Sequence, residues 1–198
     1  MEKFQNIYRI PSARATFHNY CGGIYFITIC TQNREYYFGK ITNSEMHLTA
    51  VGRHTEACIQ NIEHLHNGVF VPLYVVMPNH VHLIIIIDRE NSTPSPVETS
   101  QCGVSTIASQ CGVFTTEKDK KSEKMQQIAL KCGLLSHIVG RFKAAVTRFA
   151  RQNNIDFAWQ TRFHDRVVRG GNELNSIAEY IENNIVNWQN DELFVEQF

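Results

Sequence analysis

Runs and alternations of apolar residues divide the chain into strands and helices before any chemistry is considered. Residues 24–30, IYFITIC, are dense in aromatic and β-branched side chains and follow a Cys-Gly-Gly turn, so they predict a buried strand. Two further apolar runs, 69–77 and 81–87, are separated only by Pro78-Asn79-His80. Because this tripeptide is typical of a turn, we expect the two runs to form an antiparallel hairpin.

Three other segments, 49–65, 134–152 and 173–188, repeat their apolar residues with the period of a helix, and a fourth strand is expected within 157–169. The predicted order is therefore β-α-β-β-α-β-α. The economical fold for this order is α+β, a ferredoxin-like antiparallel sheet with helices on one face and the last helix at the C-terminus.

The segment 88–133 differs from the rest of the chain. It is rich in Ser, Thr and Lys, contains two prolines, and repeats the sequence SQCGV at 100–104 and 109–113. Such a composition buries little apolar surface and predicts a flexible insertion. We therefore expect one domain over residues 1–198, interrupted by this insertion.

The formal net charge is zero, but the charges are unevenly distributed. Residues 124–155 carry six cationic side chains and no acid, whereas the chain after Arg169 carries six acids and no Lys or Arg. This polarity predicts a basic surface that can bind phosphates. The candidates are Arg141, Lys143, Arg148 and Arg151 in the helix 134–152, then Arg166 and Arg169, and then Arg14.

The six cysteines include no CxxC pair, and the N-terminus does not resemble a signal peptide, so we expect reduced thiols and a cytoplasmic protein. The longest apolar run, 69–87, is interrupted by two prolines and two histidines. It is too polar to span a bilayer, and we expect no membrane association.

His80-Val81-His82 opens the strand expected over 81–87. Side chains alternate along a strand, so both histidines project to one face while Val81 projects to the other. Two imidazoles on one face can hold a divalent metal ion. The alternative is structural, with one histidine capping the turn and the other satisfied within the core.

Tyr180 and Asn184 are four residues apart on the last predicted helix, so they lie on one side of it, beside its apolar stripe. A tyrosine in this position often only packs on the core with its hydroxyl in water. Combined with two metal-binding histidines, however, it supplies what phosphodiester transfer needs. A phenol with a pKa of about 10 is a poor nucleophile at neutral pH, and a nearby divalent ion favours its phenolate form.

Several motifs, taken in their order along the chain, resemble those of the REP-associated tyrosine transposases. These are relatives of the insertion-sequence transposases with one catalytic tyrosine. Residues 77–83, MPNHVHL, are similar to the family's histidine signature, and 163–169, FHDRVVR, with 179–184, EYIENN, to its tyrosine segment. Residues 25–34, YFITICTQNR, and Trp159-Gln160 also match. The resemblance thus covers nearly the whole chain outside the insertion.

The resemblance implies that Tyr180 attacks the scissile phosphate of a single-stranded DNA hairpin, forming a 5′-phosphotyrosine and leaving a free 3′-hydroxyl. It also implies that His80 and His82 bind Mg²⁺ or Mn²⁺, with Asn184 as the third protein ligand. Imidazole suits Mn²⁺ better than Mg²⁺. The family has Asn-Pro where this chain has Asn184-Ile185, so the helix is expected to be free to continue beyond Asn184.

Two other functions stay open. A protein of the same fold with a vestigial site would be a hairpin-binding repressor that never becomes attached to DNA. A metallohydrolase would use His80 and His82 to activate water, but the chain has no HExxH motif and no acid between the histidines and Asp88. Members of the resembling families occur as dimers that share active sites and as monomers, so a homodimer stays open too.

Overall fold

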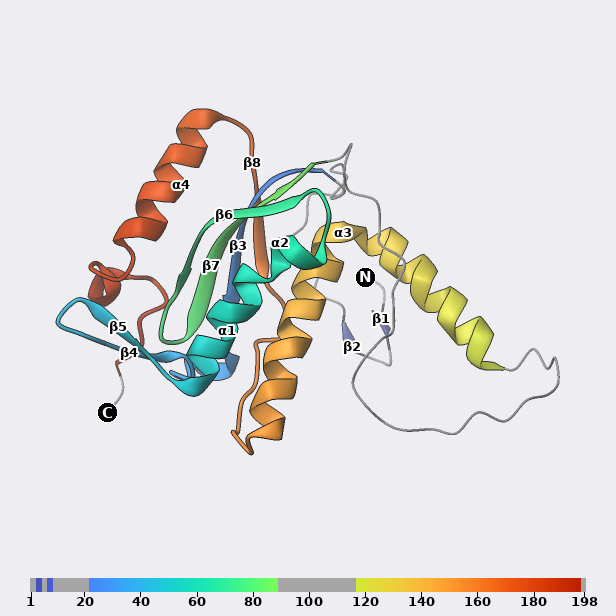
Figure 1. Cartoon of the computed structure of the whole chain (residues 1–198), viewed down its shortest axis with the longest axis horizontal. Helices are drawn as coiled ribbons and strands as arrows, with labels where there is room; N and C mark the ends of the chain where they lie inside the picture. Colours follow the sequence, from blue (N-terminus) through green and yellow to red (C-terminus); the bar gives the residue numbers. More distant parts are fainter. Residues whose placement is uncertain (1–2, 5–6, 9–21, 89–116, 197–198) are drawn as a thin grey trace.

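The computed structural model describes residues 3–4, 7–8, 22–88 and 117–196, and a four-stranded antiparallel sheet lies at its centre (Figure 1). The sheet contains β3 (Gly23–Cys30), β6 (Val69–Val76), β7 (His80–Ile87) and β8 (His164–Val168). Two separate hairpins are β1 (Lys3–Phe4) with β2 (Ile7–Tyr8) and β4 (Gly39–Thr42) with β5 (Glu45–Leu48). The helices are α1 (Ala50–Gln60), α2 (Ile62–Leu65), α3 (Glu117–Gln152) and α4 (Gly171–Asn183), with short 3-10 turns η1 (Gln32–Arg34) and η2 (Trp188–Asn190).

The strands follow the order β6-β7-β3-β8, and every neighbouring pair is antiparallel. Counted within this sheet alone, the first strand along the chain, β3, lies between the third, β7, and the fourth, β8. This is the ferredoxin-like arrangement. The predicted hairpin is β6 with β7, and its register aligns Val76 with Val81. The predicted fold class, α+β with a ferredoxin-like antiparallel sheet and a C-terminal helix, is confirmed.

One face of the sheet is covered by α1 and α3, which also contact each other. The side chains of this face alternate along the strands, as Ile27 and Ile29 do in β3 and Leu83 and Ile85 in β7, and all are buried. Ile59, Val139 and Phe142 pack onto them from the helices. This larger of the two apolar clusters makes the sheet a rigid support for the residues on its other face.

Helix α4 covers the opposite face, so the expectation that all helices share one face holds for α1 and α3 and is wrong for α4. Ile177 and Ile181 of α4 are buried against Val75, Ile84 and Val168 of the sheet. Figure 1 shows the sheet between α4 on one side and α1 with α3 on the other. The physical reason is that β7 is apolar on both faces, and each face must be shielded from water.

Two boundaries differ from the predictions. Helix α3 begins at Glu117 and contains a break at Gly133, where φ is 74°, so the second part of the predicted insertion is helical. Residues 89–116 of that insertion lie outside the described residues. Helix α4 ends at Asn183 with Asn184 as its C-cap, so the expectation of a longer helix is wrong.

Among the described residues, no helix is both long and apolar enough to cross a membrane. Cys30 and Cys58 are free thiols. The side chains of the other four cysteines lie outside the described part of the chain, so the prediction that all six are reduced stays a prediction.

Candidate functional site

The two histidines of the predicted metal pair lie at the start of β7, on the sheet face that α4 covers. Their rings are 4.5 Å apart between centroids, while Val81 between them points into the cluster beneath α1 and α3. His80 is fully buried and His82 is 3% exposed. Burial lowers the pKa of His82 to about 4 and the pKa of His80 well below its ordinary value, so both imidazoles are neutral and can donate a lone pair to a metal.

The orientation of His80 is set by Asn79. The Asn79 side-chain amide donates to the Leu193 carbonyl at 2.8 Å, which leaves its oxygen as the acceptor for His80 Nδ1 at 2.7 Å. His80 therefore carries its proton on Nδ1 and a bare lone pair on Nε2. That Nε2 atom is buried and has no hydrogen-bond partner among the described residues.

His82 is held by β3. Its Nδ1 lies 2.9 Å from Thr28 Oγ1, and its ring stacks on Phe26 at a centroid distance of 5.2 Å. When Thr28 Oγ1 accepts a hydrogen bond from the protonated Nδ1 of His82, Nε2 keeps its lone pair, as in His80. Nε2 faces the Tyr180 hydroxyl at 3.2 Å.

Tyr180 comes from α4 and reaches back over the histidines. Its hydroxyl donates to Asp191 Oδ2 at 2.9 Å, and the residue as a whole is 44% exposed. Burial, with the Asp191 hydrogen bond as the second cause, raises the pKa of Tyr180 to about 12. The phenol is therefore fully protonated at neutral pH unless a positive charge binds beside it.

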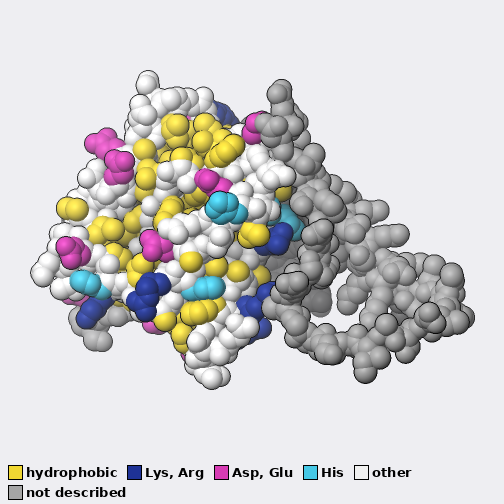
Figure 2. Space-filling view, in the orientation of Figure 1, with side chains coloured by type: hydrophobic (Ala, Val, Ile, Leu, Met, Phe, Trp, Pro, Cys, Tyr) yellow, Lys and Arg dark blue, Asp and Glu magenta, His cyan; other side chains and the backbone are white. Residues whose placement is uncertain are grey.

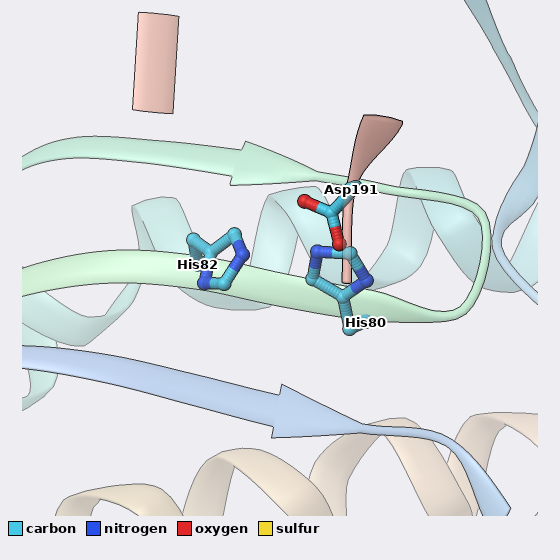
Figure 3. A group of neighbouring side chains, drawn as sticks. All are labelled: His80, His82 and Asp191. Atoms are coloured by element: carbon cyan, nitrogen blue, oxygen red, sulfur yellow. The ribbon is translucent and has the colours of Figure 1, made fainter. Parts of the chain in front are cut away.

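Asn184 lies one turn beyond Tyr180 and is 2% exposed. Its amide nitrogen donates to Asp191 Oδ2 at 3.0 Å, while its buried Oδ1 has no partner in the described part of the chain. His80, His82 and Asp191 each place one potential ligand atom within 4.8 Å of the others (Figure 3). Asp191 was not among the site residues predicted from the sequence.

These atoms fit a divalent metal ion. A buried imidazole nitrogen and a buried carboxamide oxygen, both without partners, cost free energy unless something binds them. Two neutral imidazoles, one carboxamide oxygen and one carboxylate form a mixed nitrogen and oxygen donor set, which suits Mn²⁺ and is acceptable to Mg²⁺. The Nδ1 atom of each histidine is hydrogen-bonded, to Asn79 in His80 and to Thr28 in His82. Hydrogen bonds of this kind usually orient metal-binding imidazoles.

The basic residues of α3 lie on the other side of the sheet from Tyr180. Arg141, Arg148 and Arg151 are exposed on the surface of α3 that faces away from the sheet. On the face in Figure 2, Lys and Arg side chains occur in separate groups among apolar and acidic ones. Any group bound by these arginines would therefore lie at some distance from the histidine pair.

Lys143 differs from its three neighbours in α3. Its Nζ donates to the Gln160 carbonyl at 2.7 Å and lies 5.7 Å from the centroid of the Trp159 ring. Burial lowers its pKa. The ammonium group is thus already engaged within the fold, unlike the exposed arginines.

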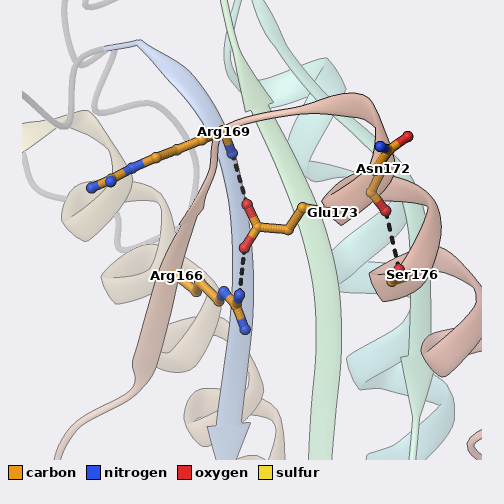
Figure 4. Close-up of polar contacts among 5 residues, drawn as sticks. All are labelled: Arg166, Arg169, Asn172, Glu173 and Ser176. Atoms are coloured by element: carbon orange, nitrogen blue, oxygen red, sulfur yellow. Dashed lines mark hydrogen bonds and ion pairs between the residues drawn. The ribbon is translucent and has the colours of Figure 1, made fainter.

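Arg166 lies on the same sheet face as the histidines, because it pairs with Phe26 in the β3–β8 register. It forms an ion pair of 2.6 Å with Glu173, whose other carboxylate oxygen accepts the Arg169 backbone N–H at 3.0 Å (Figure 4). The Arg169 side chain extends away from Glu173 (Figure 4). Arg14 lies outside the described residues.

Arg34 is a further cation near the site, and it was not among the residues predicted from the sequence. Its Nη1 lies 2.8 Å from Cys30 Sγ, and its charge contributes to the low pKa of His80. Its backbone has a φ of 61°, in the left-handed region that residues other than glycine rarely adopt. Its position at the end of the 25–34 motif is the sequence feature that could have identified Arg34 as a site residue.

Comparisons with known proteins agree with this fold. No family model matches the chain. A protein of Haemophilus influenzae, named only as uncharacterized, is 32% identical over 196 residues, which is 96% of this chain and 96% of that protein. A solved REP-associated tyrosine transposase bound to a REP hairpin has a TM-score of 0.53 at 15% identity, over 90% of this chain and 74% of that chain. The likeness to the Haemophilus influenzae protein is high enough to show that the two chains belong to one family. The likeness to the solved transposase shows only that the two chains share a fold.

Proposed function

We propose that this chain, which belongs to one family with the Haemophilus influenzae protein and has the fold of a REP-associated tyrosine transposase, cuts and rejoins single-stranded DNA through Tyr180. The observation that carries the proposal is the position of the Tyr180 hydroxyl. It lies 3.2 Å from His82 Nε2 and 2.9 Å from Asp191 Oδ2. These two residues form one possible metal-binding group with His80, whose Nε2 has no partner among the described residues. A packing tyrosine has no need of these neighbours.

His80, His82 and Asn184 would hold Mg²⁺ or Mn²⁺, with the Asp191 carboxylate close enough to contribute. A bound divalent ion supplies positive charge to the phosphate oxygens and to the attacking phenolate. The protein's part is to keep both imidazoles neutral and oriented through Asn79 and Thr28.

In the proposed cleavage step, Tyr180 Oη attacks the scissile phosphorus. A Tyr180–phosphate ester bond forms and the bond from phosphorus to the 3′ oxygen breaks. The phenolic proton passes to Asp191 Oδ2, which already accepts its hydrogen bond. The departing 3′ oxygen takes up a proton, from Asp191 after it has received the phenolic proton or from water, and becomes a free 3′-hydroxyl. Because the ester conserves the phosphodiester energy, a 3′-hydroxyl can attack it in turn and reseal a strand without another energy source.

The DNA surface would have two parts. Arg166 and Arg169 of the β8 end would contact phosphates near the cut, because Arg166 shares the sheet face of His82. Arg141, Arg148 and Arg151 of α3 would bind phosphates of the hairpin away from the cut. Arg14 stays a candidate from the sequence alone.

The test is a covalent adduct. The protein is incubated with Mn²⁺ and labelled single-stranded hairpins from its own genome, and adducts that survive denaturation are counted for the parent, Tyr180→Phe and Tyr74→Phe. Tyr74, on β6, receives a hydrogen bond from Gln60 and serves as the matched control. We expect adducts with the parent and the control only. Equal cleavage by Tyr180→Phe would make water the nucleophile, and binding without cleavage by any protein would favour the repressor.

A further inference from the structure

A pocket of about 340 Å³ opens beside Tyr180, on the side of α4 that leads into η2. That volume is within the range of small-molecule sites, about 300–1,000 Å³. The residues that line it are almost all polar, and four of them are asparagines: Ser176, Glu179, Tyr180, Asn183, Asn184, Asn187, Asn190 and Asp191. The proposed chemistry at Tyr180 uses the edge of this pocket and leaves the rest without a role.

The hydrogen-bond donors of the pocket are largely engaged within the protein. Asn183 Nδ2 donates to the Glu179 carbonyl at 2.8 Å, and Asn184 Nδ2 donates to Asp191 Oδ2 at 3.0 Å. The Ser176 hydroxyl donates to the Asn172 carbonyl at 3.1 Å, as Figure 4 shows. What these residues still offer to a ligand is mainly oxygen, from their side chains and from the carboxylate of Glu179.

Two asparagines are uncommitted. In the part of the chain that the structure describes, the side chains of Asn187 and Asn190 make no hydrogen bond, and both are exposed at the pocket wall. A carboxamide offers a donor pair and an acceptor side by side, which matches the edge of a nucleobase. The ring of Tyr180, 44% exposed at the same wall, can stack on a base.

A phosphate does not suit this pocket. Glu179 and Asp191 contribute two carboxylates, and no Lys or Arg among the described residues lines it. These carboxylates would repel a second negative charge in the pocket. A neutral group that brings hydrogen-bond donors fits the excess of acceptors.

We propose that this pocket receives a nucleobase with an exocyclic amine, adenine, cytosine or guanine, from the nucleotide next to the scissile phosphate. This inference rests on the proposed cleavage at Tyr180, since a strand whose phosphate lies at Tyr180 Oη brings its neighbouring base to the pocket wall. The amine donates to Glu179 and to the asparagine oxygens, while thymine presents carbonyl oxygens to the same acceptors. Base choice at the cut would thus come from the protein.

The experiment compares two pyrimidine oligomers that differ mainly in this amine. Fluorescent (dC) and (dT) oligomers of about 12 nucleotides, within the usual size of single-strand sites, are titrated with the Mn²⁺-loaded protein. The variants are Asn187→Ala with Asn190→Ala, and Glu179→Gln. Asn175→Ala, an exposed asparagine of α4 outside the pocket, is the matched control.

We expect the parent and Asn175→Ala to bind (dC) about tenfold more tightly than (dT). The double variant and Glu179→Gln should lose most of this preference through weaker binding of (dC), with (dT) unchanged. Equal binding of the two oligomers by the parent, or a preference that survives in the double variant, would overturn the proposal. So would a second Mn²⁺ per chain that disappears in Glu179→Gln, because the pocket would then be a cation site.

The outcomes separate this proposal from the proposed activity. A covalent adduct at Tyr180 in a protein without cytosine preference leaves the cleavage activity intact and overturns only the pocket. A cytosine preference that depends on Asn187 and Asn190, in a protein that forms no adduct, supports the pocket and removes the cleavage.

Discussion

The hydroxyl of Tyr180 donates a hydrogen bond of 2.9 Å to Asp191, a residue of the segment that follows its own helix. The same carboxylate oxygen accepts from Asn184, and its other oxygen accepts from the Leu193 backbone at 2.6 Å. One acid thus connects the proposed nucleophile, the proposed third metal ligand and the turn after η2. The strand-cutting chemistry would depend on this acid as well as on the histidines.

Replacement of Asp191 by asparagine should slow adduct formation by about 10²–10⁴-fold, because the phenolic proton loses its acceptor. The rate is measured by single-turnover assays at saturating Mn²⁺. Metal affinity is measured separately by calorimetry. A rate within a fewfold of the parent, with metal still bound, would remove Asp191 from the proton transfer.

Mn²⁺ should stabilise the protein through the two histidines. At a concentration one hundred times its dissociation constant, a ligand of the folded state adds about 2.7 kcal/mol to the free energy of unfolding. We expect a metal-dependent rise of several degrees in the midpoint of thermal unfolding, absent in His80→Ala and in His82→Ala. His64→Ala, which replaces an exposed histidine of α2, is the control and should keep the rise. A rise that survives in both site variants would place the metal elsewhere.

The histidine pair illustrates what the sequence could predict. Period-two alternation was enough to place His80 and His82 on one face, and helical spacing was enough to place Asn184 beside Tyr180. Asp191 could not be found in this way, because it lies in an irregular segment after α4, where no period relates it to the other residues.

The sequence contained a sign that both faces of the sheet are covered, although the cover of the second face by α4 was not predicted. Residues 83–87 of β7 are apolar without interruption, and all are buried or half-buried. A strand with one wet face alternates, whereas a continuous run indicates cover on both faces. The β4–β5 hairpin was missed for another reason. Its turn places Asn43 at φ 54° and Ser44 at φ 61°, and serine is not a typical residue for that conformation.

Two glycines in helices should respond oppositely to replacement by alanine. At Gly52, near the start of α1, a Cβ would lie 2.0 Å from the Phe38 carbonyl oxygen, so Gly52→Ala should lower the free energy of unfolding by about 1–3 kcal/mol or more. At Gly140 of α3 a Cβ meets nothing within 4 Å, so Gly140→Ala should raise it by about 0.5–1 kcal/mol. Urea denaturation measures both. A neutral Gly52→Ala would mean that α1 does not approach Phe38 as described.

Acid should destabilise the protein partly through His66. Burial, followed by the charges of Arg141 and His137, lowers the pKa of His66 to about 4. The unfolded chain binds this proton near pH 6.5 and the folded chain near pH 4, so the free energy of unfolding falls as the pH drops through that window. Denaturant midpoints of the metal-free protein at pH 7.5 and pH 4.5 should lie closer together in His66→Gln. An unchanged difference, equal to that of the His64→Gln control, would contradict the assignment.

The proposed cleavage joins Tyr180 covalently to the 5′ phosphate of the DNA fragment downstream of the cut, and the position of a label on the DNA shows whether it does. A hairpin oligonucleotide is labelled at its 3′ end or at its 5′ end, incubated with the protein and Mn²⁺, denatured and digested, and the modified peptide is sequenced by mass spectrometry. We expect only the 3′ label to stay on the protein, on the peptide containing Tyr180, while the 5′ label leaves on a fragment with a free 3′-hydroxyl. Attachment of the 5′ label, attachment to another residue, or cleavage with no attached label would contradict it.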